Sequence, residues 1–191
     1  MRKNFEDSFV TPLPVLMIGT YDEEGNANVM NIAWGGQCGP KHIAINIGLP
    51  EVEKKTLKNI KAKKEFTVSY ATKDTMAISD YFGLFSGNNI NKIEEAEVTV
   101  LKAENVDAPL IAEYPLTAEC KVLEMNETDI GEMHIIGEIV NISADESILD
   151  EEGNISVDKL QPIIYDSIGK TYRVVGEVVG TAFEDGIKIK K

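Results

Sequence analysis

The sequence contains few cysteines, no long apolar run and no secretion signal. Its two cysteines, Cys38 and Cys120, lie far apart and form neither a C-x-x-C redox pair nor a zinc-binding spacing. We therefore expect two reduced, buried thiols. No apolar stretch approaches the ~20 residues of a membrane span, and the basic residues after Met1 precede no apolar stretch of the kind that a signal peptide has. These absences predict a cytoplasmic protein without a membrane partner.

Positive charge is also scarce. The chain has 19 lysines and arginines against 32 aspartates and glutamates, which gives a net charge of −13 and a pI near 4.6. This balance argues against nucleic acid or an anionic membrane as a partner, although a few local cations suffice to bind one phosphate group. With 191 residues, of which 43% are hydrophobic, the chain is predicted to form one domain spanning residues 1–191.

Several familiar catalytic and nucleotide-binding motifs are missing. No strand pattern leads into G-x-G-x-x-G or G-x-x-x-x-G-K-[ST], so a Rossmann dinucleotide site and a P-loop are disfavoured. There is no G-x-S-x-G motif, and neither His42 nor His134 has an evident serine and acid partner. No group of Cys, His and carboxylate residues has metal-ligand spacing. We assign no catalytic residue and no metal site.

Strand patterns make up most of the sequence. A few short helices are interspersed, and Pro162 predicts that Ile155–Ser167 forms a loop with short turns. This mixture indicates an α+β, mainly β fold built on an antiparallel sheet or barrel. Strands are predicted at Pro14–Tyr21, Ala27–Trp34, His42–Gly48, Phe66–Ala71, Val98–Ala103, Leu116–Met125, Met133–Ile142 and Tyr172–Phe183, and helices at Glu51–Lys64, Thr75–Phe85 and Asn89–Ala96.

The pentapeptide Asp-Glu-Glu-Gly-Asn occurs twice, at Asp22–Asn26 and at Asp150–Asn154. Aspartate, asparagine and glycine favour turns through local hydrogen bonds and permissive backbone angles. We interpret the two copies as the same turn used twice, and not as an internal repeat. The first copy joins two predicted strands and therefore predicts a β-hairpin with a loop longer than two residues.

The only tryptophan, Trp34, ends a strand pattern that begins near Asn28 and runs into Gly35 and Gly36. A large ring beside backbone that can approach a ligand closely suits a flat aromatic cofactor. The alternative is a tryptophan buried in the core at a strand end.

Two segments are suited to an anion. Lys55 and Thr56 fall in the first turns of a predicted helix, where backbone amides, a hydroxyl and positive charge favour phosphate. Ser86 and Gly87 lie in a polar turn that leads to Lys92. The alternatives are a solvated lysine face for the first segment and a helix stop with a surface lysine for the second.

Taken in order, these segments resemble the flavoredoxin branch of the flavin reductase-like, FMN-binding split-barrel family. The resemblance covers most of the chain, and an aromatic–glycine, serine–glycine and then D/N-K-F/I pattern carries most of it. The matching segments are Pro14–Thr20, Asn28–Trp34, Ile45–Gly48, Lys55–Ile60, Ser79–Gly87 and Asn91–Ile93.

The resemblance implies a six-stranded antiparallel split barrel with extra helices, present as a homodimer with FMN near the dimer interface. It also implies that the protein is an oxidoreductase that transfers electrons through the bound flavin, from NAD(P)H or from a protein donor. The alternatives are a non-catalytic FMN-binding or flavin-storage module and a barrel without a cofactor. The implied cofactor contacts are Asn28, Trp34, Thr56, Lys92, His134 and Tyr165.

Physical reasoning from the residues adds to this set. The flavin ring needs an apolar slot with donors and acceptors along its pyrimidine edge, and the backbone of Met30–Trp34 and Asn46–Gly48 is suited to that edge. Because the flavin itself carries the electrons, no catalytic triad is expected. The further predicted contacts are Met30, Asn31, Ala33, Asn46 and Gly48 at the ring, and Lys55, Ser86 and Gly87 at the phosphate.

Overall fold

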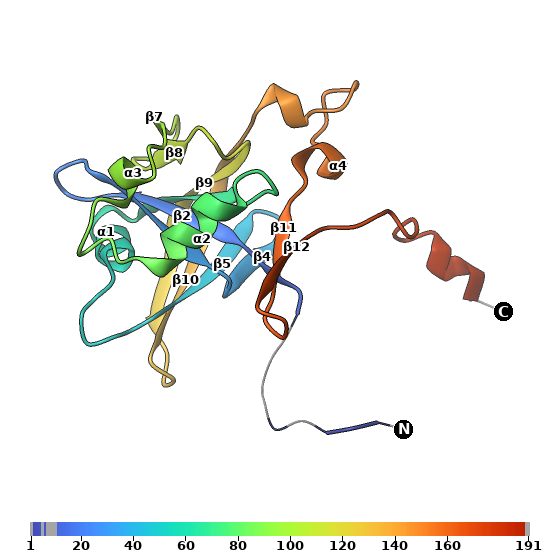
Figure 1. Cartoon of the computed structure of the whole chain (residues 1–191), viewed down its shortest axis with the longest axis horizontal. Coiled ribbons are helices and arrows are strands. Elements are labelled where there is room, and N and C mark those ends of the chain that lie inside the picture. The colour runs from blue at the N-terminus through green and yellow to red at the C-terminus, as the bar shows by residue number, and fades with distance from the viewer. Residues whose placement is uncertain (1, 5, 7–10, 190–191) are drawn as a thin grey trace.

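The computed structural model describes residues 2–4, 6 and 11–189, and its centre is a seven-stranded antiparallel sheet in the order β3-β2-β6-β9-β10-β5-β4 (Figure 1). Only Ala33 and Trp34 separate the two outermost strands, β3 and β4, so the chain itself joins the ends of the sheet into a barrel. The strands are β2 (Leu16–Tyr21), β3 (Ala27–Ile32), β4 (Gly35–Gly39), β5 (His42–Gly48), β6 (Glu65–Tyr70), β9 (Leu116–Glu127) and β10 (Glu132–Ala144).

The barrel interior is filled by strand residues that alternate with outward-facing ones. In β5, Ile43, Ile45 and Ile47 are buried while the residues between them are partly exposed, as the alternation in the sequence predicts. Helix α1 (Lys55–Lys63) adds Leu57 and Ile60 to the same core. The remaining members include Leu16, Ile18, Phe66, Val68, Cys120 and Ile135.

A second core lies between the barrel and the helices on one side of it. Helix α2 (Met76–Leu84) contributes the fully buried Phe82, which clusters with Val15, Met17 and Val29. Helices α1, α2 and α3 (Lys92–Glu95) all pack against β3. Helix α1 contributes to the barrel core, whereas α2 contributes to the second core. Strand β3 therefore contributes to any site that lies between these helices.

Two small sheets complete the fold. One has the order β1-β11-β12 and consists of β1 (Leu13–Pro14), β11 (Ile163–Asp166) and β12 (Thr171–Val174). The other pairs β7 (Val100–Lys102) with β8 (Pro109–Ile111). The remaining elements are α4 (Val157–Leu160) and the short 3-10 helices η1 (Glu146–Ile148) and η2 (Asp185–Ile189).

Three sequence-based expectations are corrected. The segment predicted as a loop with turns, 155–167, contains α4 and β11, because the Ser156 side chain caps the helix and Ile163 and Ile164 pair with the neighbouring strands. The last predicted strand ends at Val174 and not at Phe183. The first predicted helix begins at Lys55 and not at Glu51. Strand β4 was not predicted.

The two identical pentapeptides form the same turn, as predicted. Asp22 Oδ1 accepts the backbone N–H groups of Glu24 and Asn26, and Asp150 Oδ1 accepts those of Glu152 and Asn154. The glycine of each copy has a φ near +84°, which only glycine adopts without strain (Gly25, +84°; Gly153, +83°).

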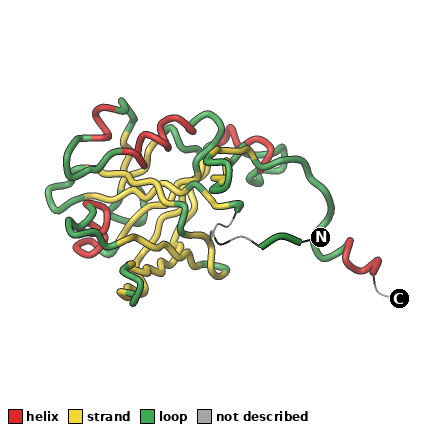
Figure 2. The backbone as a smooth tube through the Cα atoms, turned by 60° about the horizontal axis from the view of Figure 1, so that its bottom comes forward, coloured by secondary structure: helices red, strands yellow, loops and turns green. Residues whose placement is uncertain are grey.

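The described C-terminal residues leave the barrel. Figures 1 and 2 show the segment after β12 running away from the sheets and ending in η2. Of the residues that the structure covers, none belongs to a helix long and apolar enough to cross a membrane.

Candidate functional site

A polar cavity of about 280 Å³ lies between β3, the start of α1 and the connection from α2 to α3. We call it the Lys92 cavity. It gathers eight of the residues that the sequence predicts as cofactor contacts. These are Asn28, Met30, Asn31, Lys55, Thr56, Ser86, Gly87 and Lys92, and they are joined by Lys54, Phe82, Gly83, Leu84 and Phe85.

Lys92 is the most unusual residue of this cavity. Its side chain is 4% exposed, and its Nζ donates to the carbonyl oxygen of Phe82 at 2.9 Å and lies 5.7 Å from the centre of the Phe82 ring. No carboxylate among the described residues forms an ion pair with it. Burial, together with the charge of Lys54, lowers the pKa of Lys92 to about 8. An ammonium group placed in this way is stabilised by any anion that enters the cavity.

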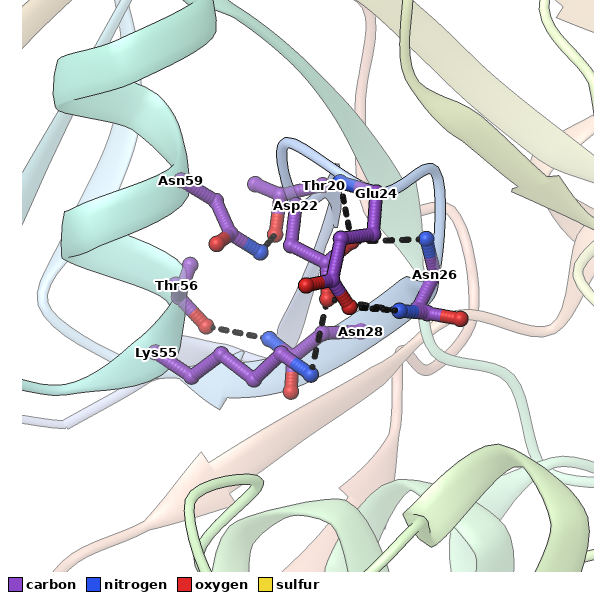
Figure 3. A network of polar contacts seen from close by, with 8 residues as sticks. All are labelled: Thr20, Asp22, Glu24, Asn26, Asn28, Lys55, Thr56 and Asn59. Atoms are coloured by element: carbon purple, nitrogen blue, oxygen red, sulfur yellow. Dashed lines mark hydrogen bonds and ion pairs between the residues drawn. The ribbon is translucent and has the colours of Figure 1, made fainter.

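Asn28 and Thr56 are held together at the floor of the cavity. Asn28 Nδ2 donates to Thr56 Oγ1 at 2.8 Å, and both side chains are buried (Figure 3). Because the Thr56 oxygen accepts this bond, its own hydroxyl hydrogen remains available to a ligand. A Cβ at Gly87 would lie 2.1 Å from Asn28 Oδ1, so glycine is required for the loop to approach this pair.

The amino end of α1 points donors at the same place. The first N–H bonded within the helix is that of Lys58, so the N–H groups of Lys55, Thr56 and Leu57 have no partner inside the helix. No side chain caps this end, and its first turn contains no acidic residue. Backbone donors, a hydroxyl and nearby lysines form an environment that favours a phosphate.

Lys55 differs from Lys92 because it already has a partner. Its Nζ lies 3.2 Å from Asp22 Oδ2 in the β2–β3 turn (Figure 3). Although partial burial acts in the opposite direction, hydrogen bonds from Asn26 and Lys55 lower the pKa of Asp22. Lys55 therefore fastens the turn to α1 and remains at the edge of the cavity.

A second polar contact fixes α1 on the barrel. The Asn59 side chain donates to Thr20 Oγ1 at 3.0 Å, and both residues are buried (Figure 3). Asn59 follows Thr56 by three positions, so it lies on the same face of the helix. This contact helps to fix the position of α1 on the barrel, and with it the position of Thr56 beside Asn28.

A neighbouring cavity of about 350 Å³ continues along β3 and shares Asn31, Gly83 and Leu84 with the first. Ala33 and Tyr165, two predicted contacts, line it. Tyr172, paired with Tyr165 at a ring-centre distance of 5.9 Å, donates its hydroxyl to Asp80 at 2.7 Å. Burial and this bond raise the pKa of Tyr172 to about 12.

Four predicted contacts lie elsewhere, on the outer face of β5 and β10 and at the start of β4. His134 Nδ1 is 2.7 Å from Asn46 Oδ1, and the Asn46 N–H donates to the carbonyl of Trp34 at 2.8 Å. Gly48 follows on the same strand. We call Trp34, Asn46, Gly48 and His134 the His134 surface; they line neither of the two cavities.

Trp34 is 59% exposed, so the alternative of a core tryptophan is wrong. The expectation of two buried thiols is also corrected: Cys120 is buried, but Cys38 is exposed because the side chains of β4 at Gln37 and Cys38 face outward. In the part of the chain that the structure describes, no group of three or more His, Cys, Asp and Glu side chains is arranged to hold a metal ion.

Sequence reasoning missed Lys54, Asp80 and Tyr172 as cavity residues. Lys54 is one of several lysines in and around the predicted helix, and no motif distinguishes it from the others. Asp80 lies in Ser79–Gly87, one of the segments that carry the family resemblance, but it has no motif of its own. Tyr172, which donates to Asp80, is 92 positions away in the sequence. No local pattern could have joined these two residues.

The sheet order and the cavity beside α1 place the chain among the antiparallel split barrels. A family model described as the flavin reductase like domain matches residues 9–176, and the chain belongs to this family. An uncharacterized protein of Aquifex aeolicus is 26% identical over 159 residues, which cover 81% of this chain and 80% of that protein.

Solved structures agree with this assignment. The flavoredoxin of Desulfovibrio vulgaris (Miyazaki F) is 32% identical, with a TM-score of 0.89 over 97% of this chain and 100% of that one. The flavoredoxin of Methanosarcina acetivorans has the same fold, at 24% identity and a TM-score of 0.87 over 99% and 98% of the two chains. Nitrilotriacetate monooxygenase component B from Bacillus cereus also shares the fold, at 22% identity and a TM-score of 0.80 over 90% and 88%.

Proposed function

We propose that this chain is an FMN-binding flavoprotein that transfers electrons through the bound flavin, from NAD(P)H or from a redox protein. Membership of the flavin reductase-like family and the likeness to flavoredoxin support a flavin cofactor and an oxidoreductase. The choice of FMN and the nature of the donor are parts of the proposal.

The observation that carries the choice of FMN is the buried Lys92 ammonium without a carboxylate partner in the part of the chain described. A lysine kept charged in a buried place is costly unless an anion joins it. The phosphate of FMN carries a charge of about −1.5 to −2 near pH 7. Thr56 and the free N–H groups of α1 supply the hydrogen bonds that such a group needs.

The residues present fit this cofactor. One phosphate can be held by Lys92, Thr56 and Ser86, and no glycine motif for a pyrophosphate is present in the sequence. The flavin, when bound, supplies the electron chemistry. The chain binds the phosphate through Lys92, holds Thr56 in place through Asn28, and limits water at the floor of the cavity through Phe82.

The proposal extends to a cytoplasmic homodimer. Trp34 and the other members of the His134 surface are the predicted ring contacts that lie outside the cavities, and a second copy would cover them. The two free cysteines agree with a reducing compartment.

The test of the cofactor is a visible spectrum of the purified protein, followed by titration of the apoprotein with FMN, FAD and riboflavin. We expect a yellow protein that prefers FMN to both. Equal affinity for FMN and riboflavin would overturn the phosphate assignment, and a colourless protein that binds no flavin would overturn the proposal as a whole.

The test of the reaction is an anaerobic titration of the holoprotein with NADH, NADPH and reduced ferredoxin. Loss of the flavin absorbance with one of these donors supports an oxidoreductase and names the donor class. A holoprotein that none of them reduces supports the alternative of a flavin-storage module.

A further inference from the structure

Residues 176–189, which we call the C-terminal arm, form no hydrogen bond or ion pair with the described residues of the barrel. The Val175 N–H donates to the Pro162 carbonyl at 3.1 Å, and this is the last hydrogen bond in the described chain that ties the C-terminal segment to the rest of the protein. All residues of the arm are exposed, and Figures 1 and 2 both show it running away from the sheets. The arm therefore makes its contacts, if any, outside its own barrel.

The composition of the arm is not that of a solvated tail. Val178, Val179 and Phe183 are 83%, 94% and 98% exposed, and Ile187 and Ile189 follow them at 68% and 83%. Segments that stay free in water are poor in β-branched and aromatic residues. So much apolar surface on one short segment indicates that another surface covers it.

The arm also offers unpaired backbone. Between Gly176 and Gly180, the N–H and carbonyl groups of residues 177–179 have no partner in the described structure. The end of the arm is organised locally, because the Thr181 N–H donates to Asp185 Oδ2 at 2.7 Å and Lys188 pairs with the same carboxylate. Apolar side chains on free, extended backbone are what a segment presents when it adds to a foreign surface.

A groove on the barrel has the matching character. It measures about 480 Å³ and lies beside the β4–β5 turn, against β9 and β10. Val140 and Ile142 stand partly exposed in it, and Lys41 is its only charged lining residue among those described. Tyr70, Leu116 and Ile139 add apolar surface to its lining.

We propose that the arm of one protomer binds in this groove of a second copy of the chain, so that two protomers exchange their arms about a twofold axis. The inference rests on the homodimer of the proposed function and names the segment that holds it together. A reciprocal exchange covers both arms and both grooves and closes the assembly at two chains.

Charge and chain length favour a second copy as the occupant. The arm carries Glu177 and Glu184, and the groove presents Lys41 without an acidic lining residue, although the whole chain has a net charge of −13. The family match ends at residue 176 and the last barrel strand ends at Ala144, so the arm is not needed to complete the barrel. Extended at ~3.3 Å per residue, residues 176–181 span ~20 Å before the local turn begins.

Disulfide trapping in the full-length chain tests the exchange directly. In a Cys38→Ser background, Ile142→Cys is combined with Val179→Cys or with Phe183→Cys, and the mildly oxidised protein is separated on a non-reducing gel. We expect a covalent dimer that needs both cysteines. A link within one chain, or no link at either arm position, overturns the proposal. Each single-cysteine variant serves as the control, and the buried Cys120 stays in place.

Sedimentation of full-length variants gives the energetic test. Val179→Asp should raise the dissociation constant of the dimer by about tenfold or more, as loss of an apolar anchor does. The matched control is Ile130→Asp in the β9–β10 turn, where the side chain is 81% exposed, and it should leave the dimer unchanged. An unchanged Val179→Asp dimer overturns the arm exchange and leaves the dimer standing. A monomeric wild type that still binds FMN overturns the exchange and leaves the proposed cofactor standing.

Discussion

The Lys92 cavity and the His134 surface contain the two ends of one predicted site, but the chain builds them differently. The cavity is enclosed by β3, α1 and the α2–α3 connection, and its lysine is buried. The His134 surface is an outer sheet face on which Trp34 is 59% exposed. Residues of a single chain enclose the cavity, whereas the His134 surface is open.

The two regions would therefore gain free energy from a ligand in different ways. At Lys92 the chain bears the cost of burying a charge in advance, so the benefit appears when an anion binds. At Trp34 an apolar ring remains in water, so the benefit appears when a flat ring or a second chain covers it. Substitutions at Lys92 should therefore change affinity for the phosphate, and substitutions at Trp34 should change the contact with the ring.

The largest effect is expected from Lys92. Lys92→Ala should weaken FMN binding by ~1.5–3 kcal/mol, the range for a hydrogen bond to a charged group, and should reduce the preference for FMN over riboflavin. Isothermal titration of the apoprotein measures both. Lys61→Ala, which removes an exposed lysine paired with Glu53, is the matched control. If both variants lose FMN equally, a general electrostatic field acts in place of a defined contact.

A pH profile gives the next largest effect. The pKa of Lys92 is about 8 in the folded chain against an ordinary value of 10.5, so the unfolded chain binds the extra proton between these values. Stability of the apoprotein conferred by this group should therefore rise with pH from about 8, by up to ~1.4 kcal/mol per pH unit. FMN affinity should fall over the same range, because the ammonium loses its proton.

The isosteric variant Lys92→Met isolates this contribution. Several tyrosines with raised pKa values, Tyr114 among them, favour the folded state less as the pH passes 10, so only the difference between wild type and variant is informative. Urea unfolding at pH 7 and pH 9.5 should show Lys92→Met as the more stable apoprotein at pH 7, with a smaller gap at pH 9.5. A constant gap would mean that Lys92 does not titrate in this range.

Much of the barrel could be predicted because its residues alternate. The alternation of Ile43, Ile45 and Ile47 predicts β5, and the repeated pentapeptide predicts the same turn at both of its positions. Strand β4 could not be predicted, since Gly35–Gly39 has no apolar alternation and is held by backbone pairing with β5. The end of the chain failed for the opposite reason: Val174, Val178 and Val179 favour strands, but beyond Val174 no partner strand is present in the described structure.

The candidate site shows the same limit. The sequence predicts Lys92 and Thr56 as cofactor contacts. In the sequence alone, however, Lys92 precedes Ile93, Glu94 and Glu95 and resembles a surface lysine. Its burial depends on the carbonyl of Phe82, ten positions away, and on the packing of α2 against β3. The burial of Lys92 and its lack of a carboxylate partner in the described structure are features of the tertiary structure. They distinguish Lys92 from Lys55, which pairs with Asp22.

A smaller effect is expected from a glycine pair, one in each region. In Gly87→Ala the new Cβ would lie 2.1 Å from Asn28 Oδ1, so the buried amide must turn and release Thr56. We expect FMN affinity to fall by ~1–2 kcal/mol, the cost of a buried polar group losing its partner. Gly48→Ala meets no atom within 4 Å and should change affinity little in a single chain. An equal loss in both variants would show that the His134 surface contributes as much as the cavity.

The smallest change in affinity is expected at Trp34, where the signal is optical. Trp34 is the only tryptophan of the chain, so its emission reports on one place above the tyrosine background. If the flavin ring lies beside it, emission should be strongly quenched in the holoprotein and restored when FMN is removed. Trp34→Phe should keep the fold and part of the affinity, because the area and planarity of the ring are largely preserved. Unchanged emission between apoprotein and holoprotein would separate the His134 surface from the cofactor, and a second copy of the chain would then be the remaining candidate to cover that exposed indole.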